Sequence, residues 1–389
     1  MNSQKFNGNR LKDARIFRGK SISSLSEECQ ITKQTLSQYE NGSIKPEPNK
    51  LFTLSCALNF PIDYFYTEDT YSIEVGTTYF RSLLSTSKID RSAQSKRLEF
   101  LAKIFDVLCE HIDFPILNIP SIRFSGTQDE NKRLQEIESI ATQLRKYWYL
   151  GDGPIKELKY TLESNGIIVT CLDPEAKAID AFSQMVKINN EQIFFVAISP
   201  TQNLVRARFD MAHELAHIVL HSWSEDIDTL TREEFKEREA QANMLASAFL
   251  LPAESFRNDI MLYPNKLSYY VHLKKKWNVS IQAMIMRAHS LHCINTYQYQ
   301  YLWRQLSRNG WRTLEPEDQP YDMKSSLMQS ALDLIFDEKV LTPKDFMIAL
   351  KLKGIVMNAS DVEKLMGLKS GTLDFKDDNS HVIKLKFKK

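Results

Sequence analysis

The sequence predicts a mostly α-helical protein of two or three domains, with one small β-sheet near the middle of the chain. Its 389 residues exceed the length of one ordinary domain. Apolar residues recur at helical spacing along most of the chain, whereas short apolar runs bounded by turn residues, typical of strands, fall between 155 and 199. The 43% apolar and 25% charged residues are typical of a globular protein.

The first domain is predicted to consist of five short helices within residues 9–66. Ser21 and Thr32 precede two of them as N-caps. Gly42 ends a helix, and a Leu/Phe stripe in 51–66 closes the domain. Residues 67–88 are rich in Ser and Thr and are predicted to be an extended tether.

Residues 91–112 are predicted to form a long amphipathic helix, which is a candidate seam for a homodimer. A second globular unit then mixes helices and strands. A helix, a Gly turn and a buried strand are expected at 155–173, and a hairpin at 181–199 that turns at Asn189-Asn190. Further helices are expected near 130–149, 208–223, 232–252 and 265–310, followed by one or two more helices and an edge strand at 381–389.

Composition excludes several classes of protein. The net charge of +1 excludes a generally polycationic chain, so contact with nucleic acid requires a local patch. No apolar run reaches the roughly 20 residues of a membrane span, and the N-terminus lacks a signal peptide. The five cysteines are scattered and form no CxxC pair, which favours reduced thiols in a cytoplasmic protein.

The stretch MAHELAHIVLH, residues 211–221, predicts a metal site. His213 and His217 are one helical turn apart on the same face, about 6 Å along the axis, so both can reach one zinc ion. Glu214 lies beside them and can hold the water that the ion activates. His221 is about 12 Å from His213 on a straight helix, too far to share the ion. We expect His221 to contact a ligand or to pack in the core.

The next helix offers a third ligand. Glu239 and Asn243 are one turn apart and share a face with Ala246 and Leu250. A carboxylate on this apolar face needs a partner, because burying it unpaired is costly. Glu239 is therefore the expected ligand, with Asn243 beside it. Two histidines, one glutamate and an open fourth position define a catalytic zinc site.

The sequence HELAH, followed by EAQAN at 239–243 and an apolar run to Pro252, resembles the ImmA/IrrE family of zinc metallopeptidases. The resemblance covers about residues 130–316. It implies an α+β zincin-like domain with a small sheet, in which His213, His217 and Glu239 hold Zn²⁺ and Glu214 is the general base.

The chemistry that this resemblance implies is peptide hydrolysis. Zinc lowers the pKa of a water molecule to about 7. Glu214 would take the proton as hydroxide attacks the peptide carbonyl, and would pass it to the leaving amine. The candidates for stabilising the oxyanion are His221, Tyr269 and Tyr270.

Residues 21–46 resemble the XRE-type, lambda-repressor-like helix-turn-helix. In that fold the third helix enters the major groove of double-stranded DNA. Residues 1–66 contain nine Lys/Arg and six Asp/Glu, a modest surplus for a phosphate-binding surface. Ile22 stands where the family usually has a phosphate-binding Gln, so a domain kept for protein contacts is the alternative. The resemblance places five residues at the DNA-facing positions: Lys33, Gln34, Thr35, Ser37 and Gln38.

The expected domain order has four parts. A helix-turn-helix domain at 1–70 precedes a tether and linker helix at 71–120. A metallopeptidase domain follows at 121–316, then a mainly helical C-terminal region of unknown role at 317–389.

This order predicts a transcriptional regulator fused to a zinc endopeptidase. The resemblance implies cleavage of a helix-turn-helix repressor, in trans or within its own tether, in a stress response that single-stranded DNA would activate. One alternative is a non-enzymatic transcription factor that senses a ligand or a metal. Another is an antitoxin-like regulator that binds a partner. The intact Glu214 favours the enzyme.

Overall fold

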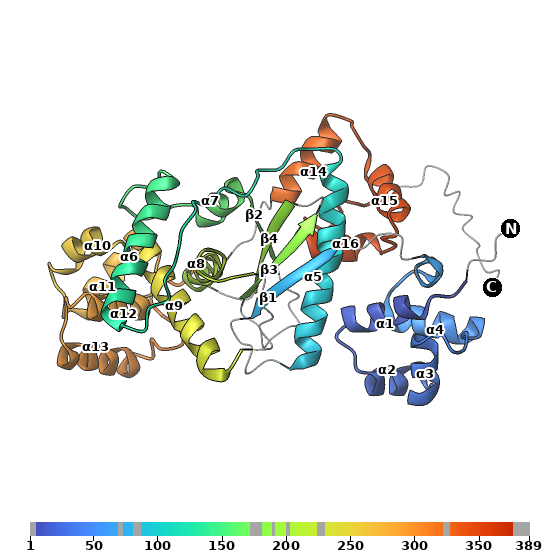
Figure 1. Ribbon diagram of the computed structural model, residues 1–389, viewed down its shortest axis with the longest axis horizontal. Coiled ribbons are helices and arrows are strands. Elements are labelled where there is room, and N and C mark those ends of the chain that lie inside the picture. The colour runs from blue at the N-terminus through green and yellow to red at the C-terminus, as the bar shows by residue number, and fades with distance from the viewer. Residues whose placement is uncertain are drawn as a thin grey trace, which may run out of the picture. The chain divides into compact units, whose positions relative to one another are not determined.

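The computed structural model describes residues 5–68, 73–80, 87–171, 181–188, 191–199, 203–223, 230–321 and 327–375. Over these residues the chain is mostly helical with one small sheet, as the sequence predicts. The chain forms two compact units, whose elements are labelled in Figure 1. One unit holds the described residues of Met1–Ser72, Lys103–Ile112 and Met328–Lys389, and the other those of Ile73–Ala102 and Asp113–Leu327.

The N-terminal domain has the five helices that the sequence predicts. Both expected N-caps form: the Ser21 hydroxyl accepts a hydrogen bond from the Ser24 amide, and the Thr32 hydroxyl one from the Thr35 amide. The helices are α1 (Gly8–Phe17), α2 (Ile22–Cys29), α3 (Lys33–Glu40), α4 (Pro48–Leu58) and the 3₁₀-helix η1 (Ile62–Tyr66).

Two contacts fix α3 against α1. The Arg15 guanidinium binds both carboxylate oxygens of Glu40, at 2.6 and 2.8 Å, where both residues are buried. Removing one partner of such a buried pair typically costs about 3–5 kcal/mol. At Gly8 a Cβ atom would lie 2.3 Å from the Tyr39 carbonyl oxygen, so only glycine permits this close approach. The orientation of α3 is therefore set by its buried side.

Three C-terminal helices belong to the same unit as the N-terminal domain. Asp361 forms an ion pair with Arg18, and the Arg10 guanidinium donates to the Gly354 carbonyl at 2.9 Å. A further ion pair joins Lys351 to Asp63 at 2.8 Å. The C-terminal region therefore packs against α1 and η1, an association that the sequence analysis did not predict. Its helices are α14 (Leu327–Asp337), α15 (Pro343–Leu352) and α16 (Ala359–Met366).

The second unit contains a four-stranded sheet. Strand β3 pairs antiparallel with both β1 and β4, while β2 runs parallel to β4. The partners Ile188 and Glu191 leave two residues for the hairpin turn; the predicted turn residues, Asn189 and Asn190, lie outside the described part of the chain. In the order β1-β3-β4-β2, the strands are Glu74–Phe80, Ala181–Ile188, Glu191–Ile198 and Ile167–Cys171.

Helices cover both faces of this sheet (Figure 1). Helix α8 (Leu204–Leu220) packs against β3 and β4. On the opposite face the Gln184 side chain donates to the Ser95 hydroxyl of α5 (Lys88–Cys109) at 3.0 Å. Successive residues of a strand point to opposite faces, so Ser183 points toward α8.

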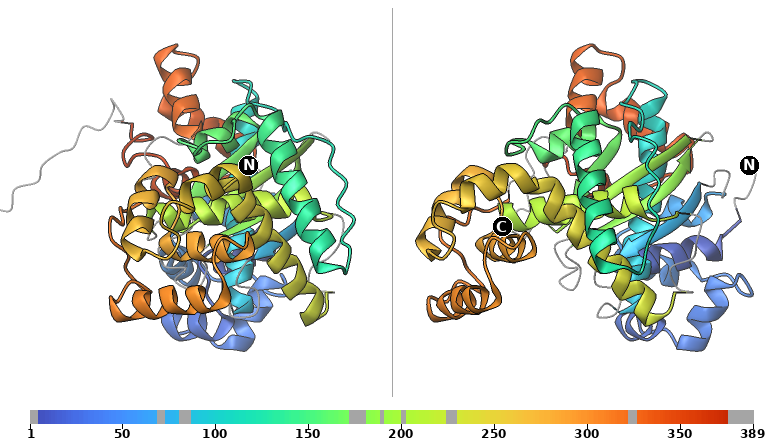
Figure 2. Two further views of the ribbon diagram at one scale, coloured as in Figure 1. Left: turned by 90° about the vertical axis from the view of Figure 1, so that its left-hand side faces the viewer. Right: turned by 60° about the vertical axis from the view of Figure 1, so that its left-hand side comes forward.

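The remaining helices of this unit build the core around α8. Helix α9 packs against α8 and lies beside α6 (Figure 2). The core includes the buried Phe249, Tyr270 and Trp277. The elements are α6 (Glu130–Tyr147), α7 (Leu158–Ser164), α9 (Arg232–Leu250), α10 (Ala253–Ile260), α11 (Leu267–Trp277), α12 (Ile281–Ser290) and α13 (Thr296–Arg308).

The expectation that the helix at 91–112 offers a dimer seam is not supported. Leu98 and Leu101, on its predicted apolar face, are 4% and 1% exposed within one chain. Their surface is already covered and is not free for a second copy. The predicted edge strand at 381–389 lies outside the described residues. Among the helices that are described, none has the length and hydropathy to cross a bilayer.

Candidate metal centre

Helix α8 presents the two histidines of the motif side by side. The Asn203 side chain caps the helix by accepting from the Arg206 amide, and the apolar residues of α8 anchor it in the core. One turn apart, His213 and His217 bring their Nε2 atoms to 3.0 Å from each other. Both rings are fully buried.

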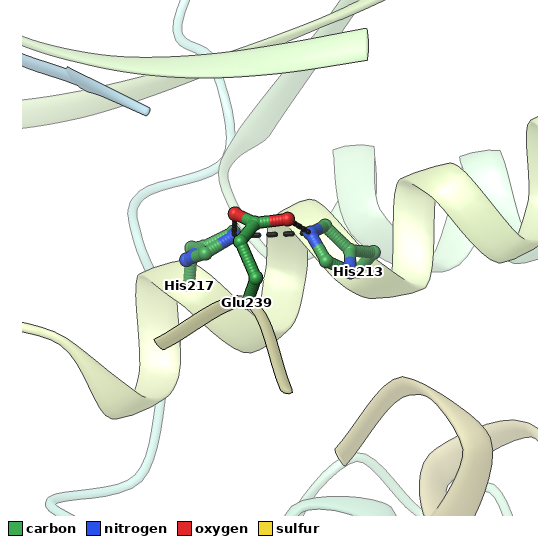
Figure 3. A group of neighbouring side chains, drawn as sticks. All are labelled: His213, His217 and Glu239. Atoms are coloured by element: carbon green, nitrogen blue, oxygen red, sulfur yellow. Dashed lines mark hydrogen bonds and ion pairs between the residues drawn. The ribbon is translucent and has the colours of Figure 1, made fainter. Parts of the chain in front are cut away.

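Helix α9 supplies the carboxylate that completes the cluster (Figure 3). Glu239 Oε1 lies 3.1 Å from His217 Nε2, and Glu239 Oε2 lies 3.4 Å from His213 Nε2. One donor atom from each of the three residues lies within 4.8 Å of the other two. Two imidazole nitrogens and a carboxylate oxygen are a donor set that suits zinc.

The carboxylate of this cluster is held in its charged form. Burial by itself raises the pKa of Glu239, but the hydrogen bonds with His213 and His217 outweigh it and lower the pKa to about 2. The group is thus ready to bind a cation at neutral pH.

The ring nitrogens that face away from the cluster are also engaged. Asn243 Oδ1 lies 3.1 Å from His213 Nδ1, and His221 Nδ1 lies 2.9 Å from His217 Nδ1. His221 Nε2 in turn lies 3.1 Å from Gln241 Oε1. Burial, with the neighbouring His217, lowers the pKa of His221 to about 3, so this ring is neutral. Such contacts orient both histidines with Nε2 toward the common point.

A serine that the sequence analysis missed contacts Glu214. The Ser183 hydroxyl of β3 donates to Glu214 Oε2 at 2.5 Å, and both residues are fully buried. The sequence signal was the polar pair Ser183 and Gln184 inside the strand AFSQMVKI, whose other residues are mostly apolar. Ser183 fixes the carboxylate of Glu214 relative to α8.

Two residues considered as oxyanion donors are engaged elsewhere. The Tyr269 hydroxyl donates to the Asp259 carbonyl at 3.1 Å, and the Tyr270 hydroxyl donates to the Pro264 carbonyl at 2.8 Å. Neither hydroxyl is brought to the metal cluster. Of the three candidates for that role, only His221 lies beside a residue of the cluster.

Two cavities border the residues that support the cluster. One, of about 480 Å³, is lined by Phe209 and Asp210 of α8, by Asn243 of α9 and by Met286 of α12. The other, of about 320 Å³, is lined by Phe124, Leu220, His221 and Gln241. Asn243, which lines the first cavity, contacts His213 of the cluster. His221, which lines the second cavity, contacts His217.

The predicted DNA-facing residues lie on the outer face of α3. Lys33, Gln34 and Ser37 are exposed, and Thr35 and Gln38 are half-buried. Thr35 also bonds its hydroxyl to that of the capping Thr32, at 2.8 Å. Hydrogen bonds and ion pairs join the C-terminal helices to this domain at α1, α4 and η1. Within the described residues, Lys33, Gln34 and Ser37 of α3 remain exposed.

The fold and the cluster together define a protein that joins a helix-turn-helix domain to a metallopeptidase-like domain. Residues 162–289 match the family model described as the IrrE N-terminal-like domain, and residues 11–65 match the model described as Helix-turn-helix. The first match contains all four residues His213, Glu214, His217 and Glu239, and the second contains α3. No curated protein matches the chain. The architecture predicted from the sequence is confirmed.

Proposed function

We propose that this chain is a DNA-binding regulator whose second unit is a zinc-dependent endopeptidase. The observation that carries the proposal is the convergence of His213, His217 and Glu239 on one point, with Glu214 on the same helix. A cluster serving structure alone would need no carboxylate at position 214. Burying an ionised carboxylate there is costly unless it is paired or hydrogen-bonded, so a site without a catalytic role would favour an apolar residue.

The residues of this site would have three separate roles: metal binding, proton transfer and positioning. His213, His217 and Glu239 would hold Zn²⁺, which when bound supplies an acidified water and polarises the peptide carbonyl. Glu214 would accept the proton of the attacking water and deliver it to the leaving amine. Ser183 would keep the Glu214 carboxylate in the orientation that proton transfer requires.

The contacts of Asn243 and His221 would support the ligands. Each contacts the Nδ1 of one ligand and so limits rotation of that ring. The loss of such a partner typically lowers metal affinity 10–100-fold. The cavities beyond Asn243 and His221 would receive side chains on either side of the bond to be cut.

The substrate that fits such a site is an extended segment of protein, because a folded helix cannot bring its carbonyl to a buried ion. Two candidates are the chain's own tether, residues 67–88, and the matching segment of a separate helix-turn-helix repressor. We favour the separate repressor. Its cleavage would relieve repression in a stress response, with single-stranded DNA as the activating signal.

The N-terminal unit would direct the chain to an operator in double-stranded DNA. Its contacts would be made by Lys33, Gln34, Thr35, Ser37 and Gln38 of α3 in the major groove.

The experiment incubates the zinc-loaded chain with single-stranded DNA and a purified helix-turn-helix repressor encoded beside it, and sequences all new N-termini. Cleavage of the repressor, absent from the Glu214→Gln chain, is the expected result. New termini within 67–88 would instead show cleavage in the tether. If both proteins stay intact although zinc is bound, the endopeptidase proposal is wrong and a metal-dependent sensor is favoured.

A further inference from the structure

Strand β1 lies along the sheet edge that is nearest the metal centre. Its neighbour β3 carries Ser183, whose hydroxyl lies 2.5 Å from Glu214. In the antiparallel register of β1 and β3, Tyr79 is the partner of Ser183. The backbone of β1 therefore runs beside the residue that holds the proposed general base. Figure 3 shows the blue ribbon of β1 on the side of α8 toward which the clustered side chains point.

A peptide to be cut at this site needs the same edge. Extended peptides are commonly held by adding a strand to the open edge of a sheet, where main-chain hydrogen bonds give affinity. Strand β3 carries the Ser183 hydroxyl that contacts Glu214, and the other edge of β3 is taken by β4. The place beside β3 where a substrate would add is the place that β1 fills.

We infer that β1 is an internal strand occupying the substrate position of the proposed peptidase, so that a protein substrate binds by replacing β1 along β3. This inference rests on the proposed function. It assigns to the segment Glu74–Phe80 an inhibitory role. In this closed form β1 fills the substrate position, and a substrate can bind only after β1 has left β3. Glu214, His213 and His217 are all fully buried in this closed form.

The pairing of β1 is suited to release. Among the described strands it has one neighbour, β3, and its register is broken by a bulge between Val75 and Thr78. At the bulge, Gly76 approaches Met185 so closely that a Cβ would lie 2.6 Å from the Met185 methyl carbon and 3.2 Å from its carbonyl oxygen. A larger residue at position 76 would weaken the pairing without touching the metal ligands.

The test measures binding of a peptide to the full chain, in a Glu214→Gln background so that nothing is cut. The probe is a fluorescein-labelled peptide with the sequence of residues 72–82, SIEVGTTYFRS. Two variants loosen β1: Gly76→Val, by crowding Met185, and Tyr79→Pro, by removing a backbone donor from the strand. The matched control is Gly153→Val, because a Cβ at Gly153 meets no atom within 4 Å. Hydrogen exchange of the β1 amides and the zinc content are measured on every sample.

A strand held in cis competes at an effective concentration of about millimolar. We therefore expect Gly76→Val and Tyr79→Pro to exchange their β1 amides faster and to bind the peptide at least about tenfold more tightly than the parent chain and Gly153→Val. Equal affinity in the loosened variants would overturn the inference. So would β1 amides that exchange no faster in either variant, because the strand would then be a permanent part of the sheet. Absence of zinc from every sample would count against the proposed function alone, since peptide binding is read without cleavage.

Discussion

The hydroxyl of Ser183 lies 2.5 Å from the carboxylate of Glu214, and so ties the central strand β3 to the helix that carries both histidines. A hydrogen bond to a charged group is worth roughly 1.5–3 kcal/mol. This bond is therefore strong enough to hold the Glu214 carboxylate in one orientation for proton transfer.

Glu214→Gln should keep zinc and lower kcat by a factor of about 10²–10⁴, because a general base is lost while all ligands remain.

Ser183→Ala should lower kcat by a factor of about 10–100 with KM little changed, since the carboxylate of Glu214 is then free to turn. Steady-state kinetics with zinc analysis check both variants. A Ser183→Ala chain with unaltered kcat would refute the positioning role of this serine.

The support of the ligand rings can be tested separately. Asn243→Ala and His221→Ala should each retain zinc but bind it about 10–100-fold more weakly, because one ligand ring loses its outer partner. Competition with a zinc chelator measures the affinity. Complete loss of zinc from His221→Ala would show that His221 is itself a ligand.

Binding to DNA should depend on the outer face of α3. Gln34→Ala and Gln38→Ala should change the DNA sequence preference as well as the affinity, because a base-edge contact contributes about 1–3 kcal/mol of discrimination against the wrong base. Lys33→Ala should weaken binding to all DNA sequences alike and reduce the salt dependence of binding. Titrations of the upstream DNA at several salt concentrations measure both effects. A chain without salt-dependent binding to this DNA would favour a domain kept for protein contacts.

Stability should depend on pH through a buried carboxyl in α7. Burial raises the pKa of Glu163 to about 7, against the opposing effects of Lys159 and the Leu327 amide. The folded-state pKa thus exceeds the unfolded value of about 4.3. The contribution to stability is full below pH 4.3 and is lost as pH rises through 7.

Glu163→Gln removes this titration. It should therefore raise the melting temperature relative to the parent chain at pH 8 and make little difference near pH 4. The exposed Glu254 provides a control, since Glu254→Gln should leave the pH dependence unchanged. An equal effect of Glu163→Gln at both pH values would contradict the raised pKa.

The sequence predicted those features that local spacing determines. The helical repeat places His213 and His217 on one face, and the apolar face shared with Ala246 and Leu250 points to Glu239 as the third ligand. The caps at Ser21 and Thr32 follow from local hydrogen bonding in the same way.

Contacts between distant segments were beyond such reasoning. The pairing of Tyr79 with Ser183 joins residues about a hundred positions apart, and no periodicity within either strand specifies the partner. The same holds for Arg18 and Asp361, since a sequence offers many oppositely charged candidate partners for each charged residue. These contacts position strand β1 and helix α16, each within its own unit, and the sequence alone did not predict them.

The central claim is that His213, His217 and Glu239 hold zinc, and metal analysis of purified protein tests it most directly. The wild-type chain should contain one zinc ion and Glu239→Ala essentially none. Glu237 is the matched control, because its carboxylate lies on the same helix but pairs with Arg133 at 3.0 Å. The Glu237→Ala chain should keep its zinc. Zinc retained by Glu239→Ala, or lost from Glu237→Ala instead, would contradict the assignment.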